Sequence, residues 1–369
     1  MVSQLRDVYD LLVVGGGPAG AAAALRAAQR DARTLLIDKQ PSPRTGADIE
    51  WLGPAGLKLC QECGLSLKKA GATEFRDLRL LSWDLRRSAA VSERDLRGWL
   101  VERAAFEEAL LREAQRAGAE TLRGLEVCDI RLGEQHALLR LSDRREVIGQ
   151  VVVIADGAAS PVGRRANLVV AAQQPTVAQA AYAQCQTTAP AVGIDVALGA
   201  SRAGQVATIV RRGTAVGVRL IARTPEQPID RLFGSFCAGA ARCGLLPEEI
   251  ARQPVRYLCP AGVALDMDTH VGKRCLLVGD AGGFVAAFSG EGIYPAMQSG
   301  WIAAETVLRA LRAPLLQDEL ATFGVAWRQR LADYLRMPNT DLSLLVPLVF
   351  GNQQMSRRVA RAFLLGQPF

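Results

Sequence analysis

Asp10–Lys39, with the sequence DLLVVGGGPAGAAAALRAAQRDARTLLIDK, is the stretch that decides the fold. It begins with an apolar run, Leu11–Val14, which is typical of a parallel strand buried on both faces. A glycine-rich turn, an alanine-rich helix and a second apolar run that ends at Asp38 follow. This order predicts a βαβ unit and therefore an α/β domain built on a parallel sheet.

Three glycines in this stretch, Gly15, Gly17 and Gly20, have the G-x-G-x-x-G spacing. The first permits a tight turn, the second lets the backbone approach a pyrophosphate, and the third lets the helix pack closely on the strand. Pro18 stands just inside the predicted helix, where its missing N–H costs nothing. Asp38 ends the second strand eighteen residues after Gly20, where it can accept hydrogen bonds from ribose hydroxyls. The stretch predicts a dinucleotide site; a glycine-rich turn without a ligand is the alternative.

The composition is that of a globular enzyme with a basic bias. The chain has 369 residues, of which 49% are hydrophobic and 22% charged, and its formal net charge is +7. The positive charge is mostly scattered arginine without interleaved aromatic residues, so we expect no nucleic acid partner. No apolar run is long enough to cross a membrane and no signal peptide is visible, so we expect no transmembrane segment and a cytoplasmic protein.

The sequence does not indicate metal chemistry. It contains only two histidines, His136 and His270, and a single C-x-x-C pair, Cys60 and Cys63. A structural zinc site needs four ligands and a catalytic one usually three. We therefore expect no metal site, and we interpret the eight cysteines as ordinary thiols.

Beyond the first βαβ unit, the patterns predict further strands and helices. Ser92–Gly118 is predicted as one long helical region, because apolar residues such as Leu96, Trp99, Leu100 and Phe106 recur at helical spacing. Three strand-like runs between residues 121 and 155 predict an antiparallel β-meander that returns to the main sheet, and runs between residues 180 and 223 predict a second, mainly antiparallel sheet. The chain from residue 315 onward is predicted to be helical.

Two further stretches have the same character as the first one. Ile154–Arg165, IADGAASPVGRR, and Leu277–Ile293, LVGDAGGFVAAFSGEGI, each follow a strand with glycine-rich turns. Asp280 is placed to bind a sugar-alcohol chain, and the helix start at Gly292–Ile293 can direct backbone N–H groups at an electron-rich ring edge. The three stretches together suit an extended dinucleotide that carries a ring system at its far end.

These three stretches resemble those of FAD-dependent oxidoreductases with the p-hydroxybenzoate-hydroxylase-like fold. That group contains aromatic monooxygenases, flavin-dependent halogenases and geranylgeranyl reductases, and the resemblance extends from residue 10 to about residue 312. It implies FAD as the cofactor. The residues implied to bind FAD are Gly15, Gly17, Pro18, Ala19, Gly20, Asp38, Lys39, Arg44, Arg103, Val127, Asp156, Gly157, Gly279, Asp280, Gly290, Gly292 and Ile293.

The resemblance also implies particular roles and a domain plan. Arg103 takes the position of an arginine that reaches FAD, and Arg44 lies in a segment similar to the loop that crosses the flavin ring. Asp156-Gly157 resembles the Asp-Gly motif of NAD(P)H-using monooxygenases, which makes NAD(P)H a candidate electron donor. The implied plan is a Rossmann-type FAD-binding domain with a β-meander, a substrate domain with a mainly antiparallel sheet, and a helical C-terminal region. The expected bounds are 1–165 with 266–312, 166–265, and 313–369, respectively.

The branch of the group is less clear from the sequence. GDAGGFVAAFSGEGIYPAMQSG, residues 279–300, is most similar to geranylgeranyl reductases, but the aromatic-rich strand motif of those reductases is replaced by RRGTAVGVRLIAR at residues 211–223. The W-x-W-x-I-P motif of the halogenases is absent as well. The leading prediction is therefore a monooxygenase that hydroxylates an aromatic or apolar substrate, free or bound to a carrier or protein, through a flavin C4a-hydroperoxide.

Two other functions stay open at this point. One is a geranylgeranyl-reductase-like enzyme acting on an apolar substrate, and the other is a flavoprotein that serves as the maturation or electron-transfer partner of another protein. An external reductase is an alternative to direct reduction by NAD(P)H. Glu291, between Gly290 and Gly292, is the candidate catalytic residue, because a carboxylate beside the flavin ring can exchange protons with flavin or substrate. Its alternative role is to brace the turn.

Overall fold

The main sheet has five parallel strands at its centre, and its order is β15-β16-β11-β1-β2-β8. The computed structural model describes residues 8–41, 48–93, 96–169, 178–199, 205–223, 227–252, 255–337 and 342–367. Strands β9 and β10 form an antiparallel meander with β11, as predicted. The strand bounds are β1 Tyr9–Val14, β2 Thr34–Asp38, β8 Glu120–Arg123, β9 Val127–Leu132, β10 Ala137–Leu141, β11 Glu146–Ile154, β15 Val271–Gly272 and β16 Cys275–Leu277.

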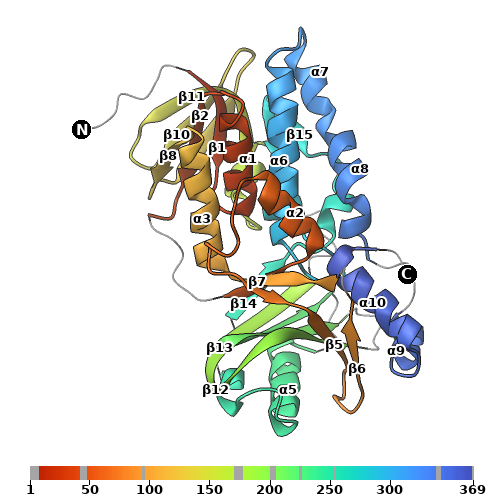
Figure 1. The fold of residues 1–369 in the computed structure, drawn as a ribbon. Coiled ribbons are helices and arrows are strands. Elements are labelled where there is room, and N and C mark those ends of the chain that lie inside the picture. The colour runs from red at the N-terminus through yellow and green to blue at the C-terminus, as the bar shows by residue number, and fades with distance from the viewer. Residues whose placement is uncertain are drawn as a thin grey trace.

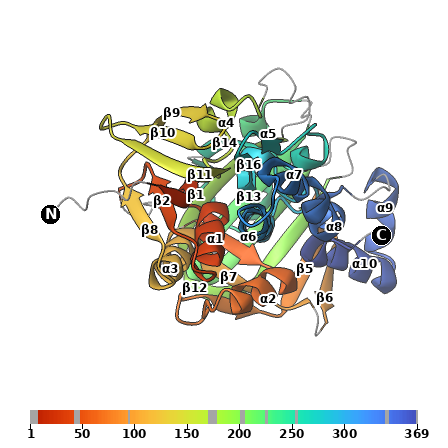
Figure 2. The ribbon, with the colours of Figure 1, turned by 90° about the horizontal axis from the view of Figure 1, so that it is seen from above.

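Each face of this sheet is covered by a different layer (Figure 2). Alternate residues of a strand point to opposite faces, so Leu11 and Val13 of β1 pack in the helical core while Leu12 and Val14 pack under the meander. Because both faces are covered, the central strands are apolar throughout their length. The helices on the side of the helical core are α1 Pro18–Ala28, α3 Arg103–Arg116, α6 Ile293–Ala310, α7 Leu316–Ala321 and α8 Phe323–Leu335.

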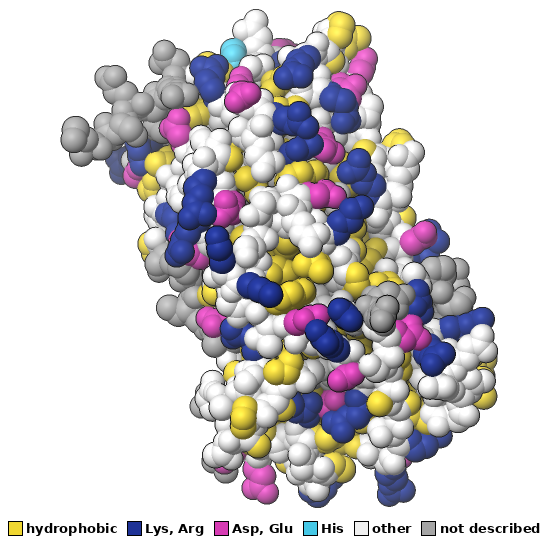
Figure 3. All heavy atoms as spheres, in the orientation of Figure 1, with side chains coloured by type: hydrophobic (Ala, Val, Ile, Leu, Met, Phe, Trp, Pro, Cys, Tyr) yellow, Lys and Arg dark blue, Asp and Glu magenta, His cyan; other side chains and the backbone are white. Residues whose placement is uncertain are grey.

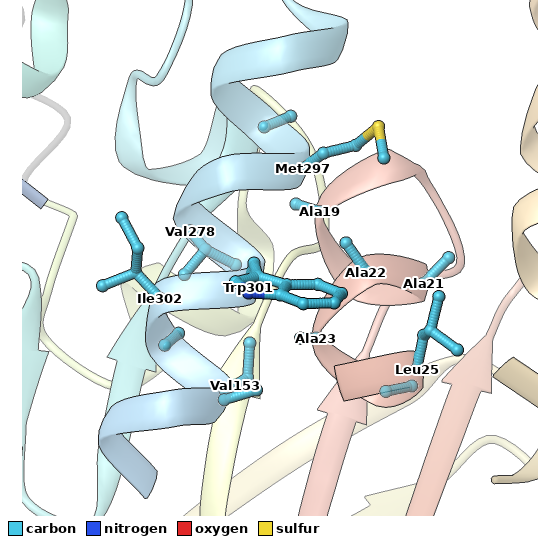
Figure 4. Packing of buried hydrophobic residues seen from close by; sticks show 14 of the residues in the cluster. Ala19, Ala21, Ala22, Ala23, Leu25, Val153, Val278, Met297, Trp301 and Ile302 are labelled. Carbon is cyan, nitrogen blue, oxygen red and sulfur yellow. The ribbon is translucent and has the colours of Figure 1, made fainter. Parts of the chain in front are cut away.

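Helices α1 and α6 lie unusually close together (Figure 4). The facing side of α1 is almost entirely alanine, and Met297 and Trp301 of α6 extend toward it into the space that these small side chains leave. Gly300 is the point of closest approach, because a Cβ built on it would collide with the carbonyl oxygen of Ala19. The short side chains of α1 are therefore what bring the start of α6 next to the start of α1.

The second part of the molecule is a mixed sheet with the order β13-β12-β5-β6, in which β14 also pairs with β12 (Figure 1). Its two long strands, β12 and β13, form an antiparallel hairpin. Helix α5 packs on one face of this hairpin through its side chains Phe233 and Phe236. A small three-stranded sheet, β3-β7-β4, lies between the two parts. The bounds are β3 Ile49–Leu52, β4 Thr73–Phe75, β5 Asp77–Ser82, β6 Ser88–Ser92, β7 Gly98–Glu102, β12 Ala178–Leu198, β13 Val206–Ala222, β14 Val255–Cys259 and α5 Ile229–Arg242.

Two sequence-based expectations differ from the structure. Residues 98–102 form strand β7, so the predicted helix over Ser92–Gly118 begins only at Arg103. Strands β5 and β6 belong to the same sheet as β12, although the domain plan placed residues 77–92 with the FAD-binding domain. In both places the deciding interactions are strand pairings with distant residues, which local hydrophobic spacing does not encode.

The C-terminal region is helical, as expected. Helices α9 Leu342–Val349 and α10 Gln353–Leu365 lie against the second part of the molecule, where Phe363 stacks on Trp51 with 5.6 Å between ring centroids. The remaining short elements are α2 Pro54–Glu62, α4 Pro161–Arg165, η3 Glu248–Arg252, η4 Val263–Leu265 and η5 Gly279–Gly282. Within the described ranges, every helix falls short of the length and apolar character needed to cross a membrane.

The contact at Gly300 predicts a large effect of a single methyl group. Gly300→Ala should lower the free energy of unfolding by about 3 kcal/mol, because the added Cβ forces two packed backbones apart. Gly234→Ala is the matched control: Gly234 lies inside α5 with no atom near its Cβ position, so alanine should be neutral or stabilise the helix. Urea unfolding followed by circular dichroism measures both changes, and equal stability of the two variants would contradict the close contact.

Candidate functional site

A cavity of about 680 Å³ opens at the carboxyl ends of the parallel strands, between the main sheet and the second sheet. This edge is where open α/β sheets place their ligands. Binding cavities for small molecules and cofactors measure roughly 300–1,000 Å³, so its size suits a large cofactor. Its walls contain residues from all three stretches that the sequence singled out: Gly15–Ala19, Asp156–Gly157 and Gly279–Ile293.

The glycine turn after β1 forms one end of the cavity. Gly15 has a φ of +104°, and a Cβ there would collide with the carbonyl oxygen of Ala155. Gly20 has no room for a side chain either, because its Cβ would meet the carbonyl oxygen of Gly15. At Gly17, by contrast, no atom lies within 4 Å of the Cβ position, so the backbone borders open cavity. Gly15 and Gly20 therefore serve the fold, and Gly17 leaves room for a ligand.

Helix α1 begins at this turn with its first N–H groups available to a ligand. Its N-cap is Gly17, and no side chain among the described residues caps it. The free N–H groups and the positive end of the helix dipole form a binding site for an anion such as a pyrophosphate. Asp38 and Lys39, at the end of β2, line the same region. Asp38 Oδ1 accepts a hydrogen bond of 3.1 Å from the Gln40 backbone N–H, which orients its carboxylate.

A chain of buried charges crosses the middle of the cavity. Arg103 pairs with Glu107 at 2.8 Å and with Glu50 at 3.6 Å, and Glu50 also forms a short ion pair with Arg219. Arg219 donates a 3.3 Å hydrogen bond to the Gly290 carbonyl, which ties the chain to the last glycine-rich turn. Burial alone would lower the pKa of Arg103, but the carboxylates of Glu107, Glu50 and Asp280 outweigh it and raise the pKa. Arg103 therefore stays charged where the sequence predicts an FAD contact.

Asp156 holds the second predicted stretch in shape. Its carboxylate accepts hydrogen bonds from the Ser160 hydroxyl at 2.6 Å and the Val162 N–H at 2.8 Å. Burial raises its pKa, and these two hydrogen bonds act in the opposite direction. Gly157 follows with a φ of +88°, a conformation that favours glycine.

Glu291 is buried and does not line the cavity. One carboxylate oxygen accepts a 2.7 Å hydrogen bond from the Tyr294 N–H in the first turn of α6, and the other accepts a 3.0 Å bond from the Tyr334 hydroxyl of α8. Burial raises the pKa of Glu291 to about 7, against the lowering effect of both hydrogen bonds. With these two hydrogen bonds, Glu291 braces the turn before α6 and links it to α8. A catalytic role of Glu291 stays a prediction.

The structure brings most of the predicted cofactor residues together. Those that line the cavity are Gly15, Gly17, Pro18, Ala19, Asp38, Lys39, Arg103, Val127, Asp156, Gly157, Gly279, Asp280, Gly290, Gly292 and Ile293. Gly20 lies behind the turn, in the contact between helix and strand. Arg44 is outside the described residues. No cluster of three His, Cys, Asp or Glu side chains able to hold a metal occurs in the described ranges.

Many lining residues escaped the sequence analysis, and four of them matter most for the second end of the cavity. They are Glu50 of β3, Tyr182 of β12, Arg219 of β13 and Cys259 at the end of β14. For two of them a signal existed, since Glu50 and Arg219 are single charges inside otherwise apolar runs, IEWL of β3 and VRLIA at the end of β13. A charge in such a position has to find a buried partner, and here each is the partner of the other.

Comparisons with known proteins agree with this geometry. A family model described as FAD dependent oxidoreductase matches residues 10–43. The digeranylgeranylglycerophospholipid reductase of Methanocaldococcus jannaschii is 27% identical over 356 residues, covering 90% of this chain and 85% of its own length. The menaquinone reductase of Mycobacterium tuberculosis is 26% identical over 372 residues, with the same coverage of 90% and 85%.

Along nine-tenths of its length the chain is similar to FAD-dependent oxidoreductases of the predicted group.

Solved structures confirm the fold of this superfamily. A geranylgeranyl bacteriochlorophyll reductase-like protein from Thermoplasma acidophilum superposes with a TM-score of 0.73 at 20% identity, over 97% of this chain and 96% of its own. A flavin-dependent brominase superposes with a TM-score of 0.72 at 17% identity, over 97% and 93%. The predicted group and the predicted Rossmann-type α/β architecture are thus both confirmed.

The open space at Gly17 predicts a variant that separates folding from cofactor binding. Gly17→Ala should leave the melting temperature of the FAD-free protein unchanged, because its φ of −70° suits alanine and the methyl group meets no protein atom. It should weaken FAD binding roughly tenfold or more, because the methyl group occupies space next to the pyrophosphate. Flavin fluorescence titration measures this. Gly351→Ala, at another unobstructed glycine far from the cavity, is the control, and equal FAD affinity of the two variants would refute the placement of the pyrophosphate.

The raised pKa of Glu291 predicts a pH dependence of stability. Between its ordinary value of 4.5 and about 7 the folded protein holds a proton that the unfolded chain has lost, so the free energy of unfolding falls as the pH rises through this window. Glu291→Gln cannot ionise, so from pH 5 to pH 8 the stability difference should change in favour of the variant, by up to about 3 kcal/mol. Urea unfolding at several pH values measures it; parallel curves for the two proteins would show that Glu291 does not titrate there.

Proposed function

We propose that this protein is an FAD-dependent reductase that saturates carbon–carbon double bonds in an apolar substrate of the isoprenoid type. The observation that carries the proposal is similarity along nine-tenths of the chain to two reductases whose names refer to isoprenoid compounds, a digeranylgeranylglycerophospholipid and menaquinone. The cavity described above supports it, because it joins a dinucleotide-binding end to a second region where proton-bearing side chains meet apolar ones.

The positions of several lining residues support the binding of FAD in this cavity. The uncapped start of α1 suits the pyrophosphate, Asp38 suits the ribose hydroxyls, and Asp280 at the end of β16 suits the sugar-alcohol chain. The start of α6, at Gly292 and Ile293, directs the positive end of a helix dipole toward the same cavity. When bound and reduced, FAD supplies a hydride.

Saturation of a double bond also needs a proton for the second carbon, and two side chains in the cavity are suited to supply it. The Tyr182 hydroxyl and the Cys259 thiol are both nearly buried and both line the cavity. Burial raises the pKa of Cys259 to about 12 and also raises the pKa of Tyr182. Both groups therefore keep their protons at neutral pH, so Tyr182 Oη or Cys259 Sγ can hold the proton that the substrate carbon takes up.

The surroundings of these groups suit an apolar substrate. Pro260, Val285 and Ile293 contribute apolar surface to the cavity wall. The charges of Glu50 and Arg219 neutralise each other in their ion pair, so an apolar chain beside them does not leave a single buried charge uncompensated. Hydrogen bonds hold Tyr182 in place: its hydroxyl donates to the Gln184 side chain and accepts a 3.2 Å bond from the Ile49 N–H.

Oxygen transfer, the leading expectation from the sequence, stays a prediction. The similarity to the flavin-dependent brominase is at 17% identity and bears on the fold alone. NAD(P)H as the electron donor, an external reductase and a role as partner of another protein are likewise predictions that no observation here favours over direct reduction of a substrate.

The test is product analysis with the FAD-loaded protein under anaerobic conditions. The protein is reduced with dithionite and, in parallel, with NADPH or NADH, and then mixed with menaquinone or a digeranylgeranylglycerophospholipid. We expect products that have gained two hydrogen atoms per reduced double bond, measured by mass spectrometry. A Tyr182→Phe/Cys259→Ala double variant should form them at least about a hundredfold more slowly, because both proton donors are lost.

The control for the double variant is FAD affinity, which should equal that of the wild type. A product that gains one oxygen atom in air, together with no product under anaerobic conditions, would overturn the reductase proposal in favour of oxygen transfer. Unchanged rates in the double variant would overturn the assignment of the proton donors while leaving the reaction itself intact.

A further inference from the structure

Helix α9 carries its apolar side chains on the outside of the molecule. Leu344 is 70% exposed and Leu348 is 54% exposed, and they lie four residues apart, on the same face of the helix. Pro347 beside them is exposed too, whereas Val346 and Val349 point inward and are buried. A surface helix normally has polar residues on its outer face. We call the three exposed side chains Leu344, Pro347 and Leu348 the α9 face.

Nothing described in the structure covers the α9 face. Figures 1 and 2 both place α9 at the periphery, beyond α10, with no other element outside it. With eight residues, α9 is about 12 Å long, so it can lie along a surface but cannot span a membrane.

Basic side chains lie on the two elements that adjoin α9, and we call these arginines the rim. Arg357, Arg358 and Arg361 lie on α10, directly after α9 in the chain, and Arg86 and Arg87 lie on the turn between β5 and β6. The Arg87 guanidinium stands over the ring of Phe350, 5.2 Å from its centroid, so this turn adjoins the end of α9.

The acidic side chains near this rim do not cancel its charge. Glu93 pairs with Arg357 at 3.2 Å and with Arg361 at 2.9 Å, and Asp84 accepts a 3.2 Å hydrogen bond from the Arg86 backbone N–H. Five arginines thus face two carboxylates, and the chain from residue 342 to its end contains no acidic residue. Figure 3 shows Asp and Glu side chains interspersed among Lys and Arg over the face that it draws.

We propose that the α9 face docks on the surface of an anionic phospholipid bilayer. An apolar helix face rimmed by arginines matches such a surface, because the leucines enter the boundary of the acyl chains while the arginines meet lipid phosphates. A second copy of this chain matches it poorly, since a symmetric contact through α9 would bring two rims of arginines together. This inference goes beyond the proposed function, because it concerns where the protein resides and not which bond it reduces.

Vesicle flotation with the full-length, FAD-loaded protein tests the proposal. The vesicles are mixtures of phosphatidylglycerol and phosphatidylcholine, or phosphatidylcholine alone. The wild type should float with the anionic vesicles at low salt, and Leu344→Gln/Leu348→Gln should weaken this binding roughly tenfold or more, because apolar burial in the bilayer is lost. Leu315→Gln/Val325→Gln is the matched control: these residues are 65% and 61% exposed but lie on other elements, so binding should be unchanged.

A second pair of variants tests the contribution of the arginine rim in the same assay. Arg86→Gln/Arg358→Gln should lower the affinity for anionic vesicles roughly tenfold at low salt, and high salt should remove most of the difference from the wild type. Arg30→Gln/Arg131→Gln removes two exposed arginines elsewhere and should leave the affinity nearly unchanged. Equal melting temperatures of all variants show that the fold is intact, as expected for exposed positions.

Three results would overturn the proposal. One is a wild type that does not float with anionic vesicles at low salt. Another is an equal loss of binding in the leucine variant and its control. The third is a dimer in sedimentation experiments that dissociates in Leu344→Gln/Leu348→Gln, which would assign the α9 face to a contact between two copies of the chain.

Discussion

The close backbone contact between α1 and α6 is the constraint on which the candidate site depends. Gly300 of α6 touches the carbonyl of Ala19, and a Cβ on Gly279 would come within 2.7 Å of the Ala19 side chain, so small residues are required on both sides. Their consequence is that two helices distant in sequence begin at the same cavity, one beside the glycine turn and one beside Asp280. A larger side chain in this contact would move one helix start away from the other, and the cavity would lose one of its two positively polarised ends.

The sequence predicted those parts of the fold whose signals are local. The β1–α1–β2 unit, the meander and the helical tail each show their own periodicity or turn residues, and all three are present. Strand β7 was missed because Leu96, Trp99 and Leu100 also fit a helical spacing; its pairing with β3 and β4 decides the structure. The pairing of β5 with β12 joins residues more than a hundred positions apart, and no local pattern reports it.

The candidate site divides in the same way. The lining of its glycine-turn end was predictable for the most part, because tight turns and helix starts impose glycines at fixed spacing. Its other end was not, because Glu50, Tyr182, Arg219 and Cys259 come from four strands that meet only after folding. Glu291 illustrates the limit of reasoning from motifs. Its neighbours Gly290 and Gly292 line the cavity, but the turn directs the Glu291 carboxylate to the Tyr294 N–H and the Tyr334 hydroxyl instead.

The order of the strands in the main sheet has a consequence for how the chain folds during its synthesis. Strands β1, β11 and β16 are neighbours in space, but β16 and the start of α6 are made only after about three-quarters of the sequence. A chain that is still being synthesised therefore has its glycine turn long before it has the opposite wall of the cavity. Pairing across such distances is slow to form. A cofactor that needs both walls of the cavity would therefore bind a nearly finished polypeptide.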